Sequence, residues 1–366
     1  MGKKRVGIIF GGKSAEHEVS LQSAKNIVEA IDPNKYEAVL IGIDKQGSWH
    51  VSDPTNYLLH ADDPKRIELN TTTDVISIVF GERQKISEND KAHVLNELDA
   101  IFPIVHGTLG EDGCLQGLLR IADVPFVGPD VLSSAICMDK DIAKKILVSA
   151  GINVAKGVSY DRTEREKITF ENVSEKLGNS MFIKPANQGS SVGVSKVSTK
   201  EEFDKGIDDA FTFDHKIIIE ETVVGREIEC SILGNEHPKA SLPGEILPQT
   251  SFYSYESKYI DEDGAILEAP ANLSDEQVQE VQDVAIHAFK ALQCEGLARV
   301  DVFLTDEGKI YVNEINTLPG FTKISMYPKL WEVSGMTYTD LISELVEFGI
   351  QRHKRDQQLK SSVFDA

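Results

Sequence analysis

One stretch near the end of the chain, Lys309-Ile310-Tyr311-Val312-Asn313-Glu314-Ile315-Asn316-Thr317, alternates apolar and polar residues in the manner of a β-strand. Because residues two apart in a strand share a face, Glu314 and Asn316 are expected to point together, on the face that carries Ile310 and Val312. The pattern therefore predicts a strand that ends with a carboxylate and an amide side by side.

A second run, Leu297-Ala298-Arg299-Val300-Asp301-Val302-Phe303-Leu304, precedes this strand across the turn-forming residues Thr305-Asp306-Glu307-Gly308. The two runs predict a β-hairpin that presents Arg299 and Asp301 on one face. If Glu307 and Gly308 are the central residues of a tight turn, Asp301 lies directly opposite Glu314. A register slipped by one residue would instead send the two acids to opposite faces.

Three oxygen-bearing side chains, Asp301, Glu314 and Asn316, would then meet beside Arg299. Facing carboxylates destabilise a bare hairpin, so this arrangement favours a cation between them. Ligands that are all oxygen atoms suit Mg²⁺, whose shell is usually completed by the phosphates of a substrate. The alternative is an exposed acidic hairpin that binds nothing.

The composition is that of a globular protein with two or three domains. Its 366 residues exceed the usual size of a single core, and a hydrophobic content of 41% is enough to fill several. A net charge of -21 argues against a nucleic-acid partner, because such binding needs a basic surface. The four cysteines lie far apart in the sequence, which argues against a zinc site or a disulfide framework and fits a reducing cytoplasm.

Nothing in the chain predicts a targeting or membrane segment. The basic residues 3–5 are followed by an apolar run that is too short for a signal peptide, and no apolar run reaches membrane-spanning length. We therefore expect a cytoplasmic protein with no membrane partner.

The first part of the chain reads as an open parallel sheet. The apolar run at 6–10 is followed by Gly11-Gly12, by Ser14 as an expected helix cap, and by a helical period that ends near Ile31. Buried-strand runs at 38–43, 75–79 and 100–105 alternate with polar or helical stretches, which is typical of this architecture. The polar residues 53–74 are interpreted as a surface excursion.

Two further parts follow, and we predict domains at 1–137, 138–228 and 229–366. A single helix is expected from about 133 to 149, strands at 181–185 and 192–197, and helices near 274–293 and 337–350. The polar tail, residues 351–366, is expected to fray.

A Gly-rich loop, Gln188-Gly189-Ser190-Ser191-Val192-Gly193, lies between the two strands of the second part. Small residues leave backbone N–H groups free to approach an anion, so we interpret the loop as a flap over phosphates; a plain hairpin turn is the alternative. It is not a Walker loop, because no Gly-Lys-Ser/Thr follows. Gly11-Gly12 likewise lacks the spacing of a dinucleotide fingerprint.

Together these residues resemble the ATP-grasp fold, in which ATP lies between two antiparallel sheets under a Gly-rich hairpin. Four motifs narrow the resemblance to the D-alanine:D-alanine ligase family: Gly11-Gly12-Lys13-Ser14-Ala15-Glu16-His17-Glu18-Val19-Ser20, His106-Gly107-Thr108-Leu109-Gly110-Glu111-Asp112-Gly113, Lys184-Pro185-Ala186-Asn187-Gln188-Gly189-Ser190-Ser191-Val192-Gly193 and Asn313-Glu314-Ile315-Asn316-Thr317-Leu318-Pro319-Gly320. Their order and spacing cover nearly the whole chain.

The resemblance implies that ATP phosphorylates one D-alanine and that the amine of a second attacks the acyl phosphate, for peptidoglycan precursor synthesis. It implies two Mg²⁺ ions, or Mn²⁺, held by Asp301, Glu314 and Asn316. It also implies catalytic roles for Glu16, Ser190, Tyr259, Arg299 and Gly320, and substrate contacts for Glu16, His106, Glu111, Gly320 and Ser325. Its implied ATP contacts are Lys140, Phe182, Lys184, Gly189, Ser190, Ser191, Glu220, Val223, Glu227, Lys258, Phe303, Asn313 and Glu314.

Several of these residues have simpler interpretations. Glu16 would be favoured by the dipole at the start of a helix whatever its function, and His106 and Glu111 could be turn residues satisfied by local hydrogen bonds. Residues 250–261 are too polar for a core strand, so we interpret them as a closing lid that excludes water; an exposed loop is the alternative.

Tyr259, within that lid, favours the dipeptide over a D-alanyl-D-lactate ester, because relatives that make the ester tend to carry Phe there. The alternatives for the whole protein are a ligase for D-lactate or another D-amino acid, and a non-catalytic ATP-binding module. A homodimer is expected from the resemblance.

Overall fold

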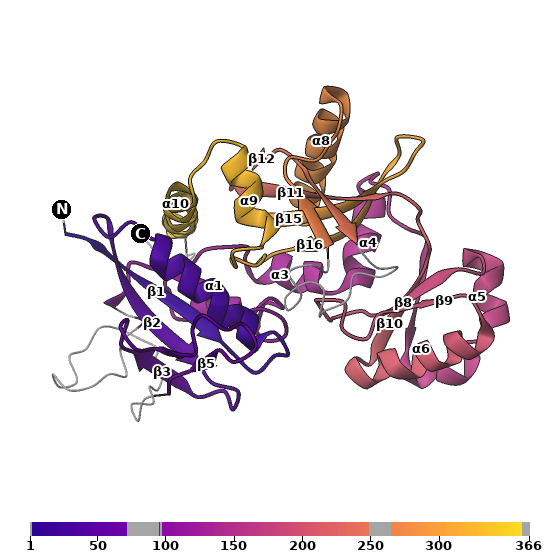
Figure 1. Cartoon of the computed structure of the whole chain (residues 1–366), viewed down its shortest axis with the longest axis horizontal. Coiled ribbons are helices and arrows are strands. Elements are labelled where there is room, and N and C mark those ends of the chain that lie inside the picture. Colours follow the sequence, from indigo (N-terminus) through magenta and orange to yellow (C-terminus); the bar gives the residue numbers. More distant parts are fainter. Residues whose placement is uncertain (1, 72–94, 96, 249–264, 361–366) are drawn as a thin grey trace.

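The computed structural model describes residues 2–71, 95, 97–248 and 265–360. Three groups of elements lie side by side in Figure 1: an N-terminal α/β part, a central body, and a smaller lobe at the opposite end. The predicted strand at 75–79 and the predicted lid at 250–261 lie outside the described residues.

The N-terminal sheet has the strand order β3-β2-β1-β6. β1 (Lys4–Gly11) pairs in parallel with β2 (Tyr36–Ile43) and β6 (Ala100–Ile104), which confirms the predicted parallel sheet. At one edge of the sheet, β3 (Trp49–Ser52) pairs antiparallel with β2. A separate hairpin is formed by β4 (Leu58–Leu59) and β5 (Glu68–Leu69).

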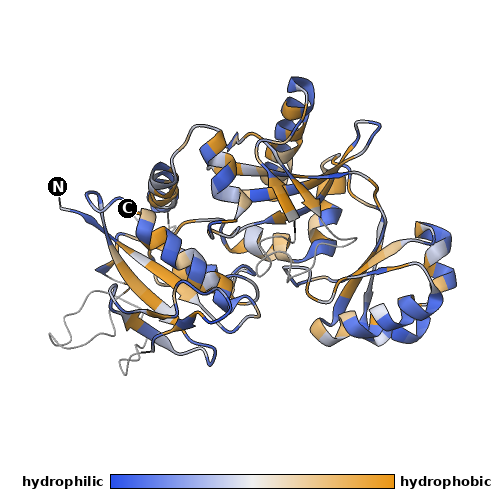
Figure 2. Ribbon diagram, viewed as in Figure 1, coloured by the Kyte–Doolittle hydropathy of each residue, from blue (hydrophilic) through white to orange (hydrophobic). Residues whose placement is uncertain are grey.

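Both faces of this sheet are buried, which explains why β1 is apolar throughout. Ile8 and Phe10 pack with α1 (His17–Ala30) on one face, whereas Ile9 packs on the other with α2 (Cys114–Ile121). In Figure 2 the strands of this part are largely orange, as expected for strands covered on two sides.

The other two sheets are antiparallel. The smaller lobe has the order β7-β10-β8-β9 and the central body the order β14-β13-β11-β15-β16, with β12 beside β11. Their bounds are β7 Gly157–Asp161, β8 Met181–Pro185, β9 Ser195–Val197, β10 Lys216–Glu221, β11 Arg226–Gly234, β12 Lys239–Ala240, β13 Gly244–Pro248, β14 Ala265–Glu268, β15 Gly296–Leu304 and β16 Ile310–Asn316. This is the predicted pair of antiparallel sheets.

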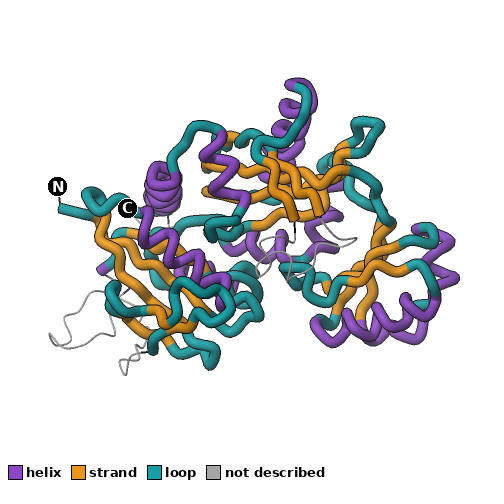
Figure 3. Tube along the Cα trace, viewed as in Figure 1, coloured by secondary structure: helices purple, strands orange, loops and turns teal. Residues whose placement is uncertain are grey.

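The helices pack against these two sheets and against the N-terminal part (Figure 3). They are α3 Val131–Met138, α4 Lys140–Ser149, the 3-10 helix η2 Arg162–Lys167, α5 Phe170–Leu177, α6 Lys200–Phe213, α8 Asp275–Ala291, α9 Met326–Val333 and α10 Tyr338–Asp356. α8 and α10 confirm the helices predicted near 274–293 and 337–350.

In the β15–β16 hairpin Asp301 pairs with Glu314, as predicted, but the turn and the strand register that produce this pair differ from the prediction. Leu304 pairs with Ile310, and Thr305 N donates to Lys309 O, so the turn has three residues instead of the predicted tight turn at Glu307-Gly308. That turn alone would place Asp301 opposite residue 313. A β-bulge between Val302 and Asp301 shifts the register by one residue and restores the Asp301–Glu314 pair.

The bulge also corrects the predicted faces of β16. Ile310 and Val312 are buried, and so is Ile315, whereas Glu314 and Asn316 are only half-buried. Glu314 and Asn316 therefore do not share the face of Ile310 and Val312. The extra residue, Asn313, interrupts the alternation of side chains between the two faces of the strand. Ile315 therefore lies on the same apolar face as Ile310 and Val312, and the other face carries the polar groups.

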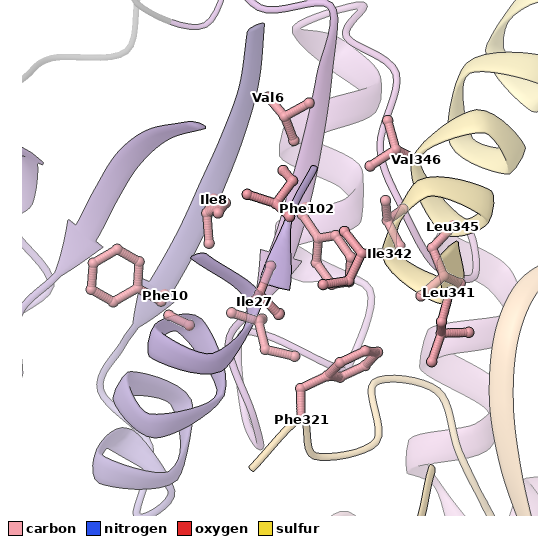
Figure 4. Packing of buried hydrophobic residues seen from close by; sticks show 14 of the residues in the cluster. Val6, Ile8, Phe10, Ile27, Phe102, Phe321, Leu341, Ile342, Leu345 and Val346 are labelled. Carbon is pink, nitrogen blue, oxygen red and sulfur yellow. The ribbon is translucent and has the colours of Figure 1, made fainter. Parts of the chain in front are cut away.

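The C-terminal helix packs against the N-terminal sheet. Leu341 and Ile342 of α10 join Phe102 of β6 and Phe321 in one buried cluster, which Figure 4 shows from close by. Ring centroids of Phe102 and Phe321 lie 5.5 Å apart in an edge-to-face contact. The predicted third domain therefore completes the core of the first, and β11 runs across the predicted boundary at 228.

Four local predictions are wrong. Ser14 does not cap α1, because Glu16 holds the N-cap position and Ser14 instead accepts from Glu16 N at 3.2 Å. The helix expected at 133–149 is two helices, since Asp139 caps the start of α4. The strand expected at 192–197 is shorter than predicted, because β9 covers only Ser195–Val197. The tail does not fray from residue 351, because α10 continues to Asp356 with Arg352 buried.

Candidate active site

A cavity of about 80 Å³ opens where the N-terminal part, the Gly-rich loop and the central sheet meet. It brings together ten of the residues predicted from the sequence: Glu16, His106, Glu111, Gly189, Ser190, Arg299, Glu314, Asn316, Gly320 and Ser325. They come from four separate segments of the chain, so the motifs that are distant in the sequence form one site.

The β15–β16 hairpin supplies the polar wall of this cavity. Arg299 donates to both carboxylate oxygens of Asp301 at 2.7 Å, and Asn316 Nδ2 donates to Asp301 Oδ2 at 3.0 Å. On the neighbouring strand Glu229 lies opposite Asp301, with its Oε2 3.0 Å from Arg299 Nε. In this structure the guanidinium of Arg299 thus contacts two facing acids, Glu229 and Asp301.

The same residues suit a divalent cation by their chemistry. Asp301, Glu314 and Asn316 offer two carboxylates and an amide oxygen from facing positions of one hairpin, which are the hard ligands that Mg²⁺ prefers. Within the ranges that the structure describes, no group of three His, Cys, Asp or Glu residues could hold a metal ion, so the amide and the phosphates of a substrate would have to complete the shell.

A cluster of lysines lies beside the hairpin. Lys140 at the start of α4 donates to Gln188 O at 2.6 Å and lies 3.6 Å from Glu314 Oε2. Lys184 of β8 lies 2.8 Å from Glu220 Oε2 and donates to Asn313 Oδ1 at 3.3 Å. Lys144, one turn after Lys140, donates to the other oxygen of Glu220.

Glu220 is the centre of that cluster. Burial would raise the pKa of Glu220, but the charges of Lys144 and Lys184 lower it to about 2. Burial also acts on the two lysines. It lowers the pKa of Lys144, whereas the pKa of Lys184 is raised because Glu220, together with Glu314 and Glu227, outweighs burial. Glu220 is therefore an ionised carboxylate at neutral pH.

The Gly-rich loop reaches across to the N-terminal part. Ser190 Oγ donates to Glu16 Oε1, and a Cβ atom on Gly189 would lie 3.3 Å from Glu16 Oε2. Ser190 and Ser191 both have positive φ, of 52° and 60°, so the backbone here is a tight reversal. Glu16 and Ser190, both implied to be catalytic by the resemblance, are therefore in direct contact.

The buried His106 pairs with the half-buried Glu111 at the N-terminal side of the cavity. Nδ1 of His106 lies 3.2 Å from Glu111 Oε1 and 3.1 Å from Leu318 O, and since a carbonyl only accepts, Nδ1 carries the proton. Burial would lower the pKa of His106, but Glu111 and then Glu16 raise it. Burial raises the pKa of Glu111, with His106 opposing. The pair is thus tied to the cavity and is not a local turn.

The expected adenine contacts lie where the two antiparallel sheets approach. Phe182 is on β8, with Lys184 Nζ 5.7 Å from its ring centroid, and Glu220 is the residue before the last of β10, shortly before Val223 in the sequence. Glu227 of β11 pairs with Phe303 of β15 on the central sheet. The remaining predicted residues, Lys258 and Tyr259, lie outside the described residues.

The sequence analysis missed two charged residues of the site. Lys144 follows Lys140 by four residues, and this helical spacing was the available signal. Glu229 alternates with Ile228 and Cys230 in a stretch that was not identified as a strand. Both residues are buried beside groups that were predicted.

Comparison with known proteins gives a consistent result. A family model described as D-ala D-ala ligase N-terminus matches residues 5–129, and one described as D-ala D-ala ligase C-terminus matches residues 146–347. The D-alanine--D-alanine ligase of Oceanobacillus iheyensis is 63% identical over 364 residues, which are 99% of this chain and 100% of that protein. D-alanine--D-alanine ligase A of Escherichia coli strain K12 is 56% identical with the same coverage.

Solved structures agree. The D-alanine-D-alanine ligase from Coxiella burnetii matches with a TM-score of 0.81 at 37% identity, covering 98% of this chain and 97% of that one. A D-Ala:D-Ser ligase from Enterococcus faecalis matches with a TM-score of 0.80 at 35% identity, covering 95% of this chain and 100% of that one. This fold therefore accommodates more than one acceptor.

Proposed function

The chain belongs to the D-alanine–D-alanine ligase family, and from this premise we propose that the cavity described above is its active site. The enzyme uses ATP to join two D-alanine molecules into D-alanyl-D-alanine for peptidoglycan precursor synthesis. One observation carries the assignment of the site: Arg299, Glu314 and Asn316 converge with Glu16 on one cavity.

The reaction proceeds in two steps. A carboxylate oxygen of the first D-alanine attacks the γ-phosphorus of ATP, and the bond to the β-phosphate oxygen breaks to release ADP. The amine nitrogen of the second D-alanine then attacks the acyl carbon, and phosphate leaves with the bonding electron pair while the amine loses a proton. The site must therefore stabilise negative charge twice and exclude water from the acyl phosphate.

The residues present suit these demands. We assign Glu16 to the ammonium of the first D-alanine, with His106 and Glu111 behind it, and Ser190 to the loop that closes over it. Arg299 and the Gly320 N–H would stabilise charge at the reacting carbon, and Ser325 would face the second carboxylate. Lys140 and Lys184 are assigned to the phosphates of ATP, because Lys140 contacts the Gly-rich loop and Lys184 contacts Asn313 at the bulge.

The residues assigned to the purine and the ribose of ATP are supported only by their positions in the two antiparallel sheets and the segment between them. We assign the purine and ribose to Phe182 of β8, Glu220 of β10, Val223 in the segment after β10, Glu227 of β11 and Phe303 of β15. Asp301, Glu314 and Asn316 are assigned to Mg²⁺ or Mn²⁺, which when bound would neutralise phosphate charge. In the structure Arg299 contacts Asp301, so binding of the metal would compete with that ion pair.

Other features remain proposals. We propose a cytoplasmic homodimer on the basis of family membership, and a domain boundary near residue 137, which falls between the two family-model matches. In the part of the chain that the structure describes, no helix has the length and apolarity needed to cross a membrane.

The product with ATP, MgCl₂ and D-alanine tests the acceptor. We expect ADP and D-alanyl-D-alanine in equal amounts, separated by chromatography, with slower turnover when D-lactate, D-serine or L-alanine replaces the second D-alanine. D-serine is included among the acceptors because one similar structure is that of a D-Ala:D-Ser ligase. Equal or faster turnover with any of these acceptors would contradict the assignment.

Glu314→Ala tests the site. Removal of this carboxylate should lower kcat by about a hundredfold or more, which is the scale for loss of one electrostatic stabiliser. Glu307→Ala is the matched control, because Glu307 lies in the same hairpin with its side chain 75% exposed. Similar kcat values for the two variants would refute the role of the hairpin.

A further inference from the structure

We propose that Lys144 is a positioning residue for the nucleotide. It binds Glu220, which in turn orients Lys184. Because Lys144 neutralises Glu220, the positive charge of Lys184 remains available to the phosphates. The inference rests on the proposed ATP site and extends it to a residue that does not itself line the cavity. The observation behind it is a buried carboxylate shared by two ammonium groups.

The geometry is that of a bridge. Glu220 is 2% exposed near the end of β10; one of its oxygens accepts from Lys144 Nζ, and the other lies 2.8 Å from Lys184 Nζ. The two lysines come from different elements, α4 and β8. Glu220 thus joins a helix to a strand through its two oxygens.

The charges explain why two lysines are needed. A carboxylate buried with one lysine would form a neutral pair, which would attract a phosphate weakly. With the second lysine, the cluster keeps one net positive charge. Lys144 therefore allows Lys184 to be held in place by an acid and still act as a cation.

Lys144 and Lys184 differ in what else they touch. The Lys144 side chain is 7% exposed and donates to Glu220, whereas Lys184 also reaches Asn313 Oδ1, next to Glu314. Lys140, on the same face of α4, donates to Gln188 O of the Gly-rich loop. Lys184 therefore reaches the hairpin beside Glu314, Lys140 reaches the Gly-rich loop, and Lys144 acts through Glu220.

Calorimetric titration of the full-length enzyme with ATP, without D-alanine, tests the proposal. Lys144→Met should raise the Kd for ATP about tenfold or more, the scale of one charge-assisted contact, and should raise the KM for ATP without changing that for D-alanine. Lys144→Arg should restore most of the affinity because it keeps the charge. Lys145→Met is the matched control, since the neighbouring Lys145 side chain is 64% exposed.

A double variant separates charge from structure. Because Glu220 is also assigned to the purine, this comparison uses inorganic triphosphate, which has no base, as the probe. Lys144→Met with Glu220→Gln again leaves one positive charge, on Lys184, so its affinity for triphosphate should exceed that of Lys144→Met alone. A purely structural role for Lys144 predicts the reverse, because the double variant has lost more contacts.

The proposal is overturned if Lys144→Met binds ATP as tightly as Lys145→Met, or if the double variant binds triphosphate no better than Lys144→Met. Failure of the proposed function would show in the wild-type enzyme, as absence of ATP binding or of dipeptide. Failure of this inference would show only in the variants.

Discussion

At the scale of single residues, Glu220 shows how the fold changes the chemistry of a side chain. Burial opposes its ionisation, but Lys144 and Lys184 more than compensate and lower its pKa from an ordinary 4.5 to about 2. Because the folded state holds the ionised form more strongly than the unfolded chain does, Glu220 stabilises the fold fully above pH 4.5. This stabilisation is lost as the pH falls toward 2.

Glu220→Gln should flatten this dependence. The melting temperature of the wild-type enzyme should fall more between about pH 5 and pH 3 than that of the variant, because the amide does not titrate. Glu201→Gln, at an exposed position of α6, should follow the wild-type profile. Parallel profiles for wild type and Glu220→Gln would mean that the ion cluster contributes nothing to acid stability.

At the scale of elements, the β15–β16 hairpin depends on two compensating irregularities. The three-residue turn would place Asn313 opposite Asp301, and the bulge moves Glu314 there instead. The bulge coincides with the point where Val312 N donates to Asn153 O at 2.9 Å, a contact with a segment far away in the sequence. It aims Asn313 at Lys184 while leaving Val312 and Ile315 in the core.

The turn itself gives a stability test. Gly308 has φ +78°, and a Cβ atom there would meet nothing within 4 Å, so only backbone strain opposes a larger residue. Gly308→Ala should lower the free energy of unfolding by about 1 kcal/mol, measured in urea, whereas Gly308→Asn should cost less because Asn tolerates this conformation. Equal stabilities of all three proteins would argue against the three-residue turn.

At the scale of the whole molecule, α10 ties the end of the described chain to the N-terminal part. Arg352 is 3% exposed, lies 4.3 Å from the centroid of the Phe126 ring, and donates to Phe126 O at 2.9 Å and to Gly128 O. These carbonyls lie just before residue 129, where the match to the N-terminal family model ends. The N-terminal part, which carries the residues proposed to bind the first substrate, is therefore held in place by contacts with α10.

A pair of glycine substitutions tests this docking. A Cβ atom on Gly349 would lie 2.6 Å from Phe126 O, so Gly349→Ala should lower the free energy of unfolding by about 1–3 kcal/mol although alanine favours helices. Gly117→Ala in α2 would meet only Val131 at 4.0 Å and should raise stability by up to about 1 kcal/mol. Thermal unfolding measures both, and stabilisation by Gly349→Ala would contradict the packing described for α10.

The sequence by itself determined the parts of this protein that depend on local pattern. Continuous apolar runs predicted the parallel strands β1, β2 and β6, and alternation predicted the hairpin that carries Asp301 and Glu314. The hairpin pattern and the family resemblance predicted ten residues that the structure brings to one cavity. Each of these signals lies within a few neighbouring residues, because side-chain period and motif spacing are local properties.

Only the tertiary structure decided how these parts meet. The bulge at Asn313 forms where a distant segment bonds to Val312, Glu229 faces Asp301 because β11 pairs with β15, and Glu220 is shared by lysines from α4 and β8. The physical reason is the same in each case: the partner comes from a remote part of the chain, and the energy of a buried charge or a shifted register depends on that partner.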